Sequence, residues 1–518
     1  MGYKEISIKL PTDYLLEELI QKIGKNLRLK NFSFQIENKS LDARKKSDIH
    51  WQLRISVFSR ELKGGKFEEI PELVIPKKIR NKKAVVIGSG PAGFFSALVL
   101  LKAGFETTII ERGSEVKKRA KSIKEFEANG IFDTKNNYAF GEGGAGTFSD
   151  GKLTSRSKHI SKEKQFILKA YINAGAPEEI IYMAHPHLGS DNLINIAGNL
   201  RGKFISLGGK IQFETMLEDL VIENGKVIEA ITSKGNIKAD EFIIASGHSA
   251  FETYRMLIAN GVKFQTKNFA IGCRIEHPAE IINMAQWGFK NLPGVKAAEY
   301  RLTTQGKTSL PVYTFCMCPG GIVVPSAAYK NTNIVNGMSL YKRDGNFANA
   351  ACVAGINPEN LFGKKTTASE TLDWLENLEH SFFEYSNDYR APFCSIQDFI
   401  NKKIPTEIPD SSYPLGLNPA PLWDLLPSQV SDSIREGLMI FNKKIKGFET
   451  GIIMGLESKT SSPVQALRDS NGLCEGMKNL YIAGEASGYA GGIISSAADG
   501  IKAAMSIVTG STTNLVEH

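Results

Sequence analysis

Residues 83–112 constrain the fold of this 518-residue chain more than any other segment. They read KAVVIGSGPAGFFSALVLLKAGFETTIIER, in which an apolar run, a glycine-rich turn, a longer apolar run and a second short apolar run follow one another. We expect a buried strand at 84–87, a helix at 92–103 that Gly104 ends as a C-cap, and a second strand at 105–110. The segment therefore predicts a βαβ unit with parallel strands.

The turn before the predicted helix carries Gly88, Gly90 and Gly93 in the G-x-G-x-x-G spacing. The first glycine permits a tight turn, the second lets a pyrophosphate approach the backbone, and the third lets the helix pack closely on the sheet. The helix N-terminus supplies free N–H groups and the positive end of the dipole, which stabilise a diphosphate. Glu111 follows the second strand, where a carboxylate can accept hydrogen bonds from ribose hydroxyls. Because the whole context of the motif is present, the segment predicts a dinucleotide site.

Residues 84–101 carry no charge over 18 positions, a length that would also fit a membrane span. The Gly-Ser-Gly-Pro interruption and the helix-ending Gly104 favour a buried core segment instead. The first residues of the chain lack the basic-then-apolar pattern of a signal peptide, so we expect a cytoplasmic protein without a membrane span. Six cysteines in a chain of this length predict free thiols rather than a disulfide framework.

Residues 1–80 are expected to form a small basic α+β module. Alternating apolar positions at 3–10 predict a strand, helical spacing at 11–23 predicts a helix, and 32–37 and 49–58 again have the pattern of strands. A linker rich in proline and lysine follows this βαββ pattern. The module therefore ends before the dinucleotide-binding unit begins.

The positive charge of the chain is concentrated in this module. Of a formal net charge of +8, residues 1–82 contribute 18 Lys and Arg against 11 Asp and Glu, an excess of 7. The run Arg44, Lys45 and Lys46 could contact RNA, an anionic membrane or an acidic partner. A solvated loop between two strands is the favoured interpretation, because like-charge runs this short are usually exposed and no aromatic-interleaved nucleic-acid signature accompanies this one.

A second glycine-rich segment, NYAFGEGGAGTFSDGKLTSRSK, follows the βαβ unit. Gly141, Gly143 and Gly146 repeat the G-x-G-x-x-G spacing, but the polar stretch FDTKNN before them cannot be a buried parallel strand. We therefore reject a second nucleotide-binding motif and interpret the segment as a loop whose backbone donors close over an anion or a planar ring. A flexible surface loop is the alternative, and the density of glycines favours the ligand-binding interpretation.

Two histidines precede a further predicted helix at 190–200, for which Ser190 or Asp191 would be the N-cap. His185 and His187 are two positions apart, but no Cys, Asp or Glu completes a metal-ligand spacing nearby, so no metal site is predicted. His187, at the junction between loop and helix, could donate a proton to a substrate. A structural histidine with satisfied hydrogen bonds is the favoured alternative.

Residues 210–239 consist of four strand-like runs, IQFET, LEDLVIE, KVIEAITS and NIKA, which predict a β-meander. The apolar run 241–245 then returns to the sheet and ends at Ser246, Gly247 and His248. The order of βαβ unit, glycine loop, helix, meander and returning strand is typical of a flavin-type dinucleotide domain rather than of a simple NAD dehydrogenase.

Residues 251–455 have the amphipathic strands and polar loops of a mixed α/β substrate domain, with helices expected at 368–385 and 428–441. Cys316 and Cys318 form a C-x-C pair within it. The pair is too close for an easy disulfide and lacks the second pair that a zinc site requires. A redox role is one interpretation, and two small buried thiols are the favoured one.

A second strand-glycine-helix unit lies near the end of the chain. A short apolar strand at 480–483 leads to Gly491 and Gly492, and an apolar helix is expected at 493–508. The N-terminus of this helix offers another set of free N–H donors.

The motifs GEGGAGTFSDGKL, ASGHSA, CPGG, TSSP and GEASGYAGGI resemble those of a bacterial family of uncharacterised FAD-dependent dehydrogenases. This family lies within the glutathione-reductase superfamily of two-dinucleotide-fold flavoproteins, and the resemblance extends over essentially the whole chain. It implies an α/β fold with a Rossmann-like FAD-binding domain, built from a parallel sheet and a β-meander, beside a mixed α/β substrate domain and a small N-terminal α+β domain. The implied domains are 1–80, 83–250 with 456–510 for FAD, and 251–455 for the substrate.

The resemblance also implies which residues contact FAD. Backbone groups of the first turn would hold the diphosphate, the acid after the second strand would hold the adenosine ribose, and the second glycine loop would line the isoalloxazine. Glu485 stands where many relatives have aspartate, which keeps the acceptor and lengthens its reach. The implied cofactor-binding residues are Gly88, Gly90, Pro91, Ala92, Gly93, Glu111, Arg112, Gly143, Gly144, Gly146, Thr147, Ser149, Met216, Leu217, Ser246, Gly247, Gly484, Glu485, Gly491, Gly492 and Ile493.

The function expected from this resemblance is hydride transfer between flavin N5 and a small organic substrate, with NAD(P)H or a protein as a further electron partner. No second NAD(P) fold is apparent, which argues against a disulfide-reductase mechanism. An FAD-dependent hydroxylase is one alternative, and a flavin-bearing protein that binds RNA or another partner through residues 1–80 is a second. The candidate catalytic residues are His187, His248, Arg274, His277 and Arg343.

Overall fold

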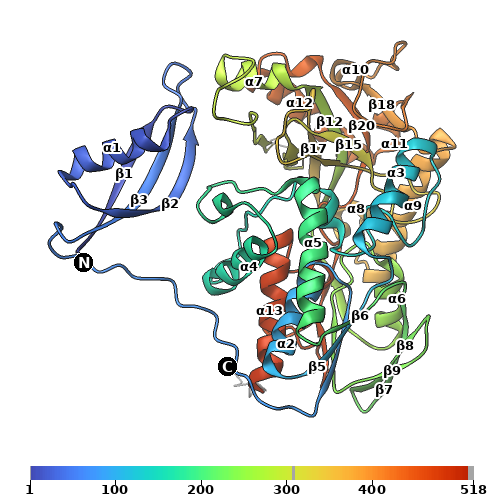
Figure 1. Cartoon of the computed structure of the whole chain (residues 1–518). Coiled ribbons are helices and arrows are strands. Elements are labelled where there is room, and N and C mark those ends of the chain that lie inside the picture. The colour runs from blue at the N-terminus through green and yellow to red at the C-terminus, as the bar shows by residue number, and fades with distance from the viewer. Residues whose placement is uncertain (1, 306–309, 511–518) are drawn as a thin grey trace.

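The computed structural model describes residues 2–305 and 310–510, and Figure 1 shows a small N-terminal module beside a larger body. The module contains β1 (Gly2–Leu10), α1 (Leu16–Leu27), β2 (Ser33–Asp42) and β3 (His50–Ser59). Its antiparallel sheet has the order β1-β3-β2, and its core includes Leu19, Ile23, Leu53, Ile55 and Val57. The βαββ prediction is confirmed, although β2 extends into the polar segment that was expected to be a loop.

The module contacts the body through Lys39 of β2. The Lys39 N–H donates to the Tyr182 carbonyl at 2.8 Å, and the Ala184 N–H donates to the Lys39 carbonyl at 2.9 Å. The Lys39 ammonium lies over the rings of Tyr14 and Trp51, 4.8 and 4.6 Å from their centroids, and burial lowers its pKa. The two backbone hydrogen bonds fix the module against the segment that leads into His185.

A five-stranded parallel sheet forms the centre of the body. Its strands, in spatial order, are β22 (Leu480–Ile482), β10 (Glu241–Ile244), β4 (Lys83–Ile87), β5 (Glu106–Ile110) and β6 (Lys210–Gln212). Helices α2 (Pro91–Ala103) and α13 (Ile493–Thr509) lie next to each other along it (Figure 1). Ala84 and Val86 face the core that contains these helices, whereas Val85 and Ile87 face a second core. Burial on both faces explains why β4 is a continuous apolar run.

The meander has three strands rather than four. It consists of β7 (Leu217–Glu223), β8 (Lys226–Thr232) and β9 (Ile237–Lys238). The first predicted run forms β6 instead, which pairs with β5 in the parallel sheet. The alternation of a short run cannot distinguish an edge strand of the central sheet from the first strand of a meander, because both are half-buried.

The helices between β5 and β6 are α3 (Val116–Asn129), α4 (Ser161–Asn173) and α5 (Gly189–Ser206). The predicted bounds and N-cap of α5 are wrong. The helix begins at Gly189 with Leu188 as its N-cap, and neither Ser190 nor Asp191 caps it. Asp191 instead accepts a hydrogen bond from the Tyr341 N–H at 2.9 Å, so a tertiary contact uses the side chain that would have capped the helix.

A seven-stranded sheet organises the second half of the body. Its strands, in spatial order, are β13 (Thr303–Thr304), β14 (Val312–Cys318), β17 (Phe347–Ile356), β12 (Phe269–Pro278), β20 (Ile452–Glu457), β18 (Ala391–Ser395) and β19 (Leu417–Pro419). Its strand pairs are antiparallel except for β18 with β19. The predicted helices at 368–385 and 428–441 are confirmed as α9 (Ala368–Ser386) and α12 (Ser428–Lys444).

Shorter elements complete the body. Two-stranded sheets pair β11 (Phe264–Thr266) with β21 (Val464–Ala466) and β15 (Ile322–Pro325) with β16 (Val335–Met338). The remaining α-helices are α6 (Phe251–Ala259), α7 (Ala279–Trp287), α8 (Pro358–Phe362), α10 (Ile396–Asn401) and α11 (Leu422–Leu425). Among residues 2–305 and 310–510, no helix combines the length and the apolar character needed to cross a membrane.

Candidate FAD and substrate site

Two of the three glycines in the turn after β4 are required by close packing. A Cβ atom on Gly88, whose φ is +100°, would lie 2.4 Å from the Ala245 carbonyl oxygen. A Cβ atom on Gly93 would lie 1.9 Å from the Gly88 oxygen. By contrast, a Cβ atom on Gly90 would meet only the Cα of Gly144, at 3.7 Å. The three positions therefore serve the turn, the helix–sheet contact and the approach between the two glycine-rich segments.

Glu111 ties this turn to the second glycine loop. Its buried carboxylate accepts hydrogen bonds from the Ser89 N–H at 3.0 Å and the Ser89 hydroxyl at 2.7 Å. The Gly113 N–H, at 2.9 Å, and the Gly141 N–H, at 3.2 Å, donate to the other oxygen. A single acid at the end of β5 thus orders three backbone segments around the place where a ribose is expected.

Arg119 organises the second glycine loop from inside the protein. Its side chain is 0% exposed, and its guanidinium donates to five backbone carbonyls. These acceptors are the carbonyl oxygens of Asn137, Tyr138, Gly141, Glu142 and Gly144. Burial lowers the pKa of Arg119 to about 10, so it carries its charge at neutral pH.

Sequence reasoning missed Arg119, although a signal was present. Val116, Ile123 and Phe126 form the buried stripe of α3, and Arg119 lies on the same stripe. A single arginine among the apolar positions of an amphipathic helix indicates a buried charge that must have several acceptors.

The loop before α13 is tied to the returning strand β10 through a histidine. His248 Nδ1 lies 2.6 Å from Glu485 Oε2, and Glu485 Oε1 accepts from the Gly492 N–H at 2.8 Å. The Gly484 N–H donates to Asp499 Oδ2 at 2.8 Å. His248 is therefore brought together with Glu485 of the C-terminal glycine unit, and Asp499 is a partner of that unit that sequence reasoning did not find.

The residues at this place fit a bound dinucleotide. Cβ atoms on Gly247, Gly491 and Gly492 would meet no atom within 4 Å, so the backbone is open at all three positions. The buried hydroxyl of Ser496, in the first turn of α13, has no hydrogen-bond partner in the described chain. Open backbone and an unpaired hydroxyl at a helix N-terminus are suited to the phosphates and hydroxyls of FAD.

Two groups predicted to contact the adenosine end are engaged within the protein. The Met216 N–H donates to Ser233 Oγ at 3.0 Å, and the Ser233 N–H donates to the Met216 carbonyl at 3.0 Å. Leu217 is paired with Thr232 in the meander. The backbone of Met216 is therefore occupied, which leaves its side chain as the group that could contact an adenine.

Arg112 is also engaged. It forms an ion pair with Glu252, and its guanidinium lies 3.7 Å from the centroid of the Phe140 ring. The glycine loop begins directly after Phe140, so this cation–π contact positions the start of the loop.

A small, mostly apolar cavity of about 50 Å³ lies next to the glycine loop. Gly90, Gly143, Phe94, Tyr171 and Ile493 are among the residues that line it. This volume suits a few water molecules rather than a flavin ring.

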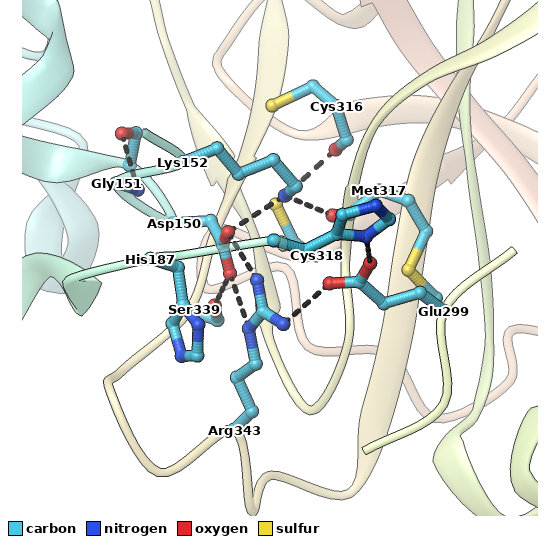
Figure 2. A network of polar contacts seen from close by, with 12 residues as sticks. Asp150, Gly151, Lys152, His187, Glu299, Cys316, Met317, Cys318, Ser339 and Arg343 are labelled. Carbon is cyan, nitrogen blue, oxygen red and sulfur yellow. Dashed lines mark hydrogen bonds and ion pairs between the residues drawn. The ribbon is translucent and has the colours of Figure 1, made fainter. Parts of the chain in front are cut away.

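A polar network follows the glycine loop, and we call it the Asp150 cluster (Figure 2). Asp150 accepts from Arg343 Nε at 2.9 Å and Nη2 at 2.7 Å, from Lys152 Nζ at 2.8 Å, and from the Ser339 hydroxyl. Burial opposes its ionisation, but the charges of Lys152 and Arg343 hold the pKa of Asp150 well below its usual range. The cluster therefore contains a fixed anion that holds two cations in place.

Glu299 extends the Asp150 cluster to the surface. It accepts from Arg343 Nη1 at 2.6 Å and lies 3.2 Å from His185 Nδ1. Although burial opposes ionisation, His185 and Arg343 lower the pKa of Glu299 to about 2. The Lys152 ammonium also donates to the Met317 carbonyl, and its side chain remains 30% exposed. Of the two cations that contact Asp150, Lys152 thus has the more exposed side chain, since that of Arg343 is only 6% exposed.

His187 lies beside the Asp150 cluster and is neutral at physiological pH. Burial and the nearby charge of Arg343 lower its pKa to about 4. His187 Nε2 is 3.0 Å from the Tyr341 carbonyl, which can only accept, so the ring proton lies on Nε2 and Nδ1 carries the lone pair.

Arg274 belongs to a neighbouring buried group. Its side chain is 0% exposed and donates to Glu457 at 2.8 Å, to Asn349 at 2.8 Å and to the Cys316 carbonyl at 2.6 Å. Burial raises the pKa of Glu457 to about 7, although the charge of Arg274 opposes this shift. Lys152 and Arg274 hold the carbonyls of consecutive residues, Met317 and Cys316, so this group adjoins the Asp150 cluster.

His277 is separate from the other candidate catalytic residues. Its ring is 0% exposed, packs on Phe448 and lies with Nε2 2.7 Å from the Phe448 carbonyl. It lies in the core of the body, where a substrate cannot contact it. Burial lowers its pKa to about 4.

His277→Gln is expected to remove part of the acid sensitivity of folding. The pKa of His277 is 6.5 in the unfolded chain and about 4 in the folded chain. Between these two pH values a proton binds His277 in the unfolded chain but not in the folded one. The contribution of the neutral His277 ring to the free energy of unfolding is therefore complete above pH 6.5 and is lost as the pH falls to about 4. Its size is about 3 kcal/mol, at ~1.4 kcal/mol per pKa unit. Denaturant unfolding between pH 4 and 7 measures it, with His159→Asn, at an exposed histidine, as the control.

A weaker pH dependence of the free energy of unfolding in His277→Gln than in wild type is the expected result. Equal slopes in the two proteins would show that His277 titrates normally in the folded chain.

The basic run of the N-terminal module forms one local contact and one contact with the body of the protein. Arg44 pairs with Asp42, and Lys46 Nζ lies 3.4 Å from the Met284 carbonyl. These contacts offer no specific support for a nucleic-acid surface. Within the described part of the chain, no group of three or more His, Cys, Asp or Glu side chains is arranged to hold a metal ion.

Comparisons with known proteins identify the cofactor class. A family model for the C-terminal domain-like region of FAD-dependent proteins matches residues 268–460, and an FAD-binding domain model matches residues 81–125. A protein of Clostridium beijerinckii (strain ATCC 51743 / NCIMB 8052), described as uncharacterized, is 38% identical over 530 residues, covering 98% of this chain and 99% of that one. The cofactor is FAD, as both family models specify.

Solved flavoprotein structures share only a general likeness. L-proline dehydrogenase from P. horikoshii is 14% identical, with 85% of this chain and 96% of that chain covered and a TM-score of 0.35. Glycine oxidase from Bacillus cereus ATCC 14579 is 12% identical, with 83% and 95% covered and a TM-score of 0.32. At these scores the likeness supports no statement about the activity of this chain.

Proposed function

The chain belongs to the same family as the Clostridium beijerinckii protein and is an FAD-dependent flavoprotein, and from this premise we propose that it is a dehydrogenase or reductase for a small organic substrate. We further assign it to the two-dinucleotide-fold superfamily of glutathione reductase. In this proposal residues 83–250 and 456–510 hold FAD, and residues 251–455 cover the substrate. When bound, FAD supplies the hydride acceptor or donor of the reaction at N5 of its flavin ring.

The residues proposed to hold FAD come from both glycine-rich units. The turn at Gly88–Gly93 and the N-terminus of α2 would bind the diphosphate, because their N–H groups and helix dipole favour an anion. Glu111 would hold the ribose and Glu485 the ribityl chain. The N-terminus of α13 would stabilise negative charge on the flavin pyrimidine.

The observation that carries the substrate assignment is the direct continuation of the glycine loop into the Asp150 cluster. Gly143–Ser149 is the segment proposed to line the flavin ring, and Asp150 follows it immediately. Lys152, two residues further on, is fixed by Asp150 and the Met317 carbonyl while 30% of its side chain remains exposed. An ammonium held in this way can bind a carboxylate or polarise a carbonyl without reorganising.

His187 is the proposed proton acceptor. Its neutral ring directs Nε2 to the Tyr341 carbonyl and leaves the lone pair on Nδ1. Removal of a hydride from a C–H bond beside a hydroxyl or amine requires loss of a proton as well, which Nδ1 would take. Arg343 acts differently: its N–H groups are bonded to Asp150 and Glu299, so it is a positioning residue.

Lys152→Met is expected to leave FAD bound and to slow flavin reduction by the substrate about 100-fold, as removal of a preorganised donor does in other enzymes. The measurement is the rate of loss of oxidised-flavin absorbance after anaerobic mixing. Lys158→Met, at an exposed lysine in the same segment, is the control and should retain the wild-type rate. A Lys152→Met enzyme that is reduced at the wild-type rate would contradict the placement of the substrate.

A further inference from the structure

Cys316 occupies a strained position at a bulge in β14. Phe315 pairs with Ala351 of β17, and the next pair is Cys318 with Asn349, so β14 has one extra residue at this point. Cys316 has a φ of +45°, in the left-handed region that residues other than glycine rarely adopt. Bulges and left-handed side-chain-bearing residues are concentrated at functional sites, where the surrounding structure maintains the strain.

Cys316 is also the most exposed cysteine of the chain. All six cysteines lie in the described residues; Cys316 is partly exposed and the other five are buried. Cys318 is 0% exposed, and its Sγ lies 3.4 Å from the Cys316 carbonyl oxygen. The bulge therefore places the buried Cys318 thiol against the backbone of the partly exposed Cys316.

Two cations hold the backbone of this bulge. Arg274 Nη2 donates to the Cys316 carbonyl and lies 3.5 Å from Cys318 Sγ. Lys152 Nζ donates to the Met317 carbonyl, and Figure 2 shows its ammonium beside Cys318. The hydrogen bond from the Cys318 thiol, followed by the charges of Lys152 and Arg274, lowers the pKa of Cys316, and the same interaction raises the pKa of Cys318. Of the two cysteines, Cys316 is therefore the one whose thiolate is favoured, and Cys318 the one whose thiol is favoured.

We propose that Cys316 and Cys318 form a redox-active thiol pair that reacts with a hydroperoxide. The Cys316 thiolate attacks the peroxide O–O bond, which forms a sulfenic acid on Cys316 and releases an alkoxide or hydroxide that takes a proton from solvent. The C-x-C spacing disfavours a disulfide in a regular strand, but the extra residue and the left-handed Cys316 backbone give this pair a different geometry. The Cys318 thiol then attacks the sulfenic sulfur, which forms the Cys316–Cys318 disulfide and releases water. Sulfur loses two electrons in total, and the peroxide oxygen gains them.

Thiol mapping of the full-length FAD-loaded protein tests the pair without requiring turnover. The protein with its cysteines reduced is treated with one equivalent of tert-butyl hydroperoxide. It is then denatured in the presence of N-ethylmaleimide, which alkylates the free thiols, and digested for mass spectrometry. We expect a disulfide between Cys316 and Cys318 that dithiothreitol reverses. Cys474 and the three other cysteines should be found alkylated, because they stay free thiols during the peroxide treatment. In native protein without peroxide, iodoacetamide should label Cys316 at least about ten-fold faster than Cys474, because only a thiolate is nucleophilic.

Two variants make the result decisive. In Cys318→Ser, Cys316 should be trapped as a sulfenic acid by dimedone, and in the control Cys474→Ser the disulfide should form as in wild type. Oxidation of Cys316 no faster than that of Cys474 would overturn the proposal. Absence of dimedone labelling in Cys318→Ser, with the thiol still free, would overturn it as well.

Discussion

Gly93→Ala is expected to abolish FAD binding and to destabilise the whole body of the protein. The added Cβ would lie 1.9 Å from the Gly88 carbonyl oxygen, a backbone atom that cannot rotate away as a flexible side chain could. Relief requires α2 to move from β4, which opens the turn that is proposed to hold the diphosphate. We expect a loss of at least about 3 kcal/mol in the free energy of unfolding, at the upper end of overpacking costs. Flavin content after gel filtration and denaturant unfolding measure the two effects.

Gly198→Ala is the matched control for this substitution. Gly198 lies inside α5, and a Cβ atom there would meet nothing within 4 Å. Alanine is a better helix former than glycine by about 1 kcal/mol, so this variant should retain its flavin and be slightly more stable than wild type. If Gly93→Ala retained full flavin content, the close helix–sheet contact would not be a requirement for the site.

Arg119→Met is the second substitution with a large expected effect. It removes a donor of five backbone carbonyls in the glycine loop. The Gly141 and Gly144 carbonyls still accept from the Gly144 and Thr147 N–H groups, whereas those of Asn137, Tyr138 and Glu142 lose the donor that Arg119 supplies. Each unsatisfied buried acceptor costs about 1–3 kcal/mol, and the loop can relax to hydrate some of them. We expect a loss of about 3–5 kcal/mol in the free energy of unfolding, with much weaker FAD binding. Arg119→Lys, which keeps the charge and three donors, should give an intermediate result.

Lys117→Met supplies the control for Arg119. Lys117 is exposed on the same helix, so its loss should change the free energy of unfolding by no more than about 0.5 kcal/mol. If Arg119→Met matched Lys117→Met in stability and flavin affinity, the loop would hold its conformation without the buried guanidinium.

The parts of the fold that could be predicted are those set by local pattern. The alternation of buried strand, glycine turn and apolar helix in residues 83–112 fixes β4, α2 and β5, because each of these elements has its own periodicity or turn residue. The placement of β6 could not be predicted in this way. Whether a three-residue strand joins the central sheet or the meander depends on its pairing partner, which is far away in the sequence.

Some residues of the candidate site could likewise be predicted from the sequence, and others could not. The glycines and Glu111 could be proposed as FAD-binding residues from the sequence, because a dinucleotide requires those residue types at that spacing. Arg119, Asp499 and the Asp150 cluster could not be assembled from spacing, since Asp150 and Arg343 are 193 residues apart. Lys152 did lie within the motif GEGGAGTFSDGKL, but only the structure shows that Asp150 and the Met317 carbonyl fix its ammonium. His277 had the residue type of a catalytic group and proved to lie in the core.

An anaerobic metabolite screen of the FAD-loaded protein tests the proposed dehydrogenase or reductase activity most directly. Absorbance of oxidised flavin is followed for wild type, Lys152→Met and Lys158→Met with a panel of hydroxy acids, amino acids, related amines, NADH and NADPH. We predict that at least one organic compound of the panel bleaches the flavin of wild type and Lys158→Met, and does so about 100-fold more slowly in Lys152→Met. The proposed activity would be contradicted if dithionite reduced the flavin and no organic compound of the panel did.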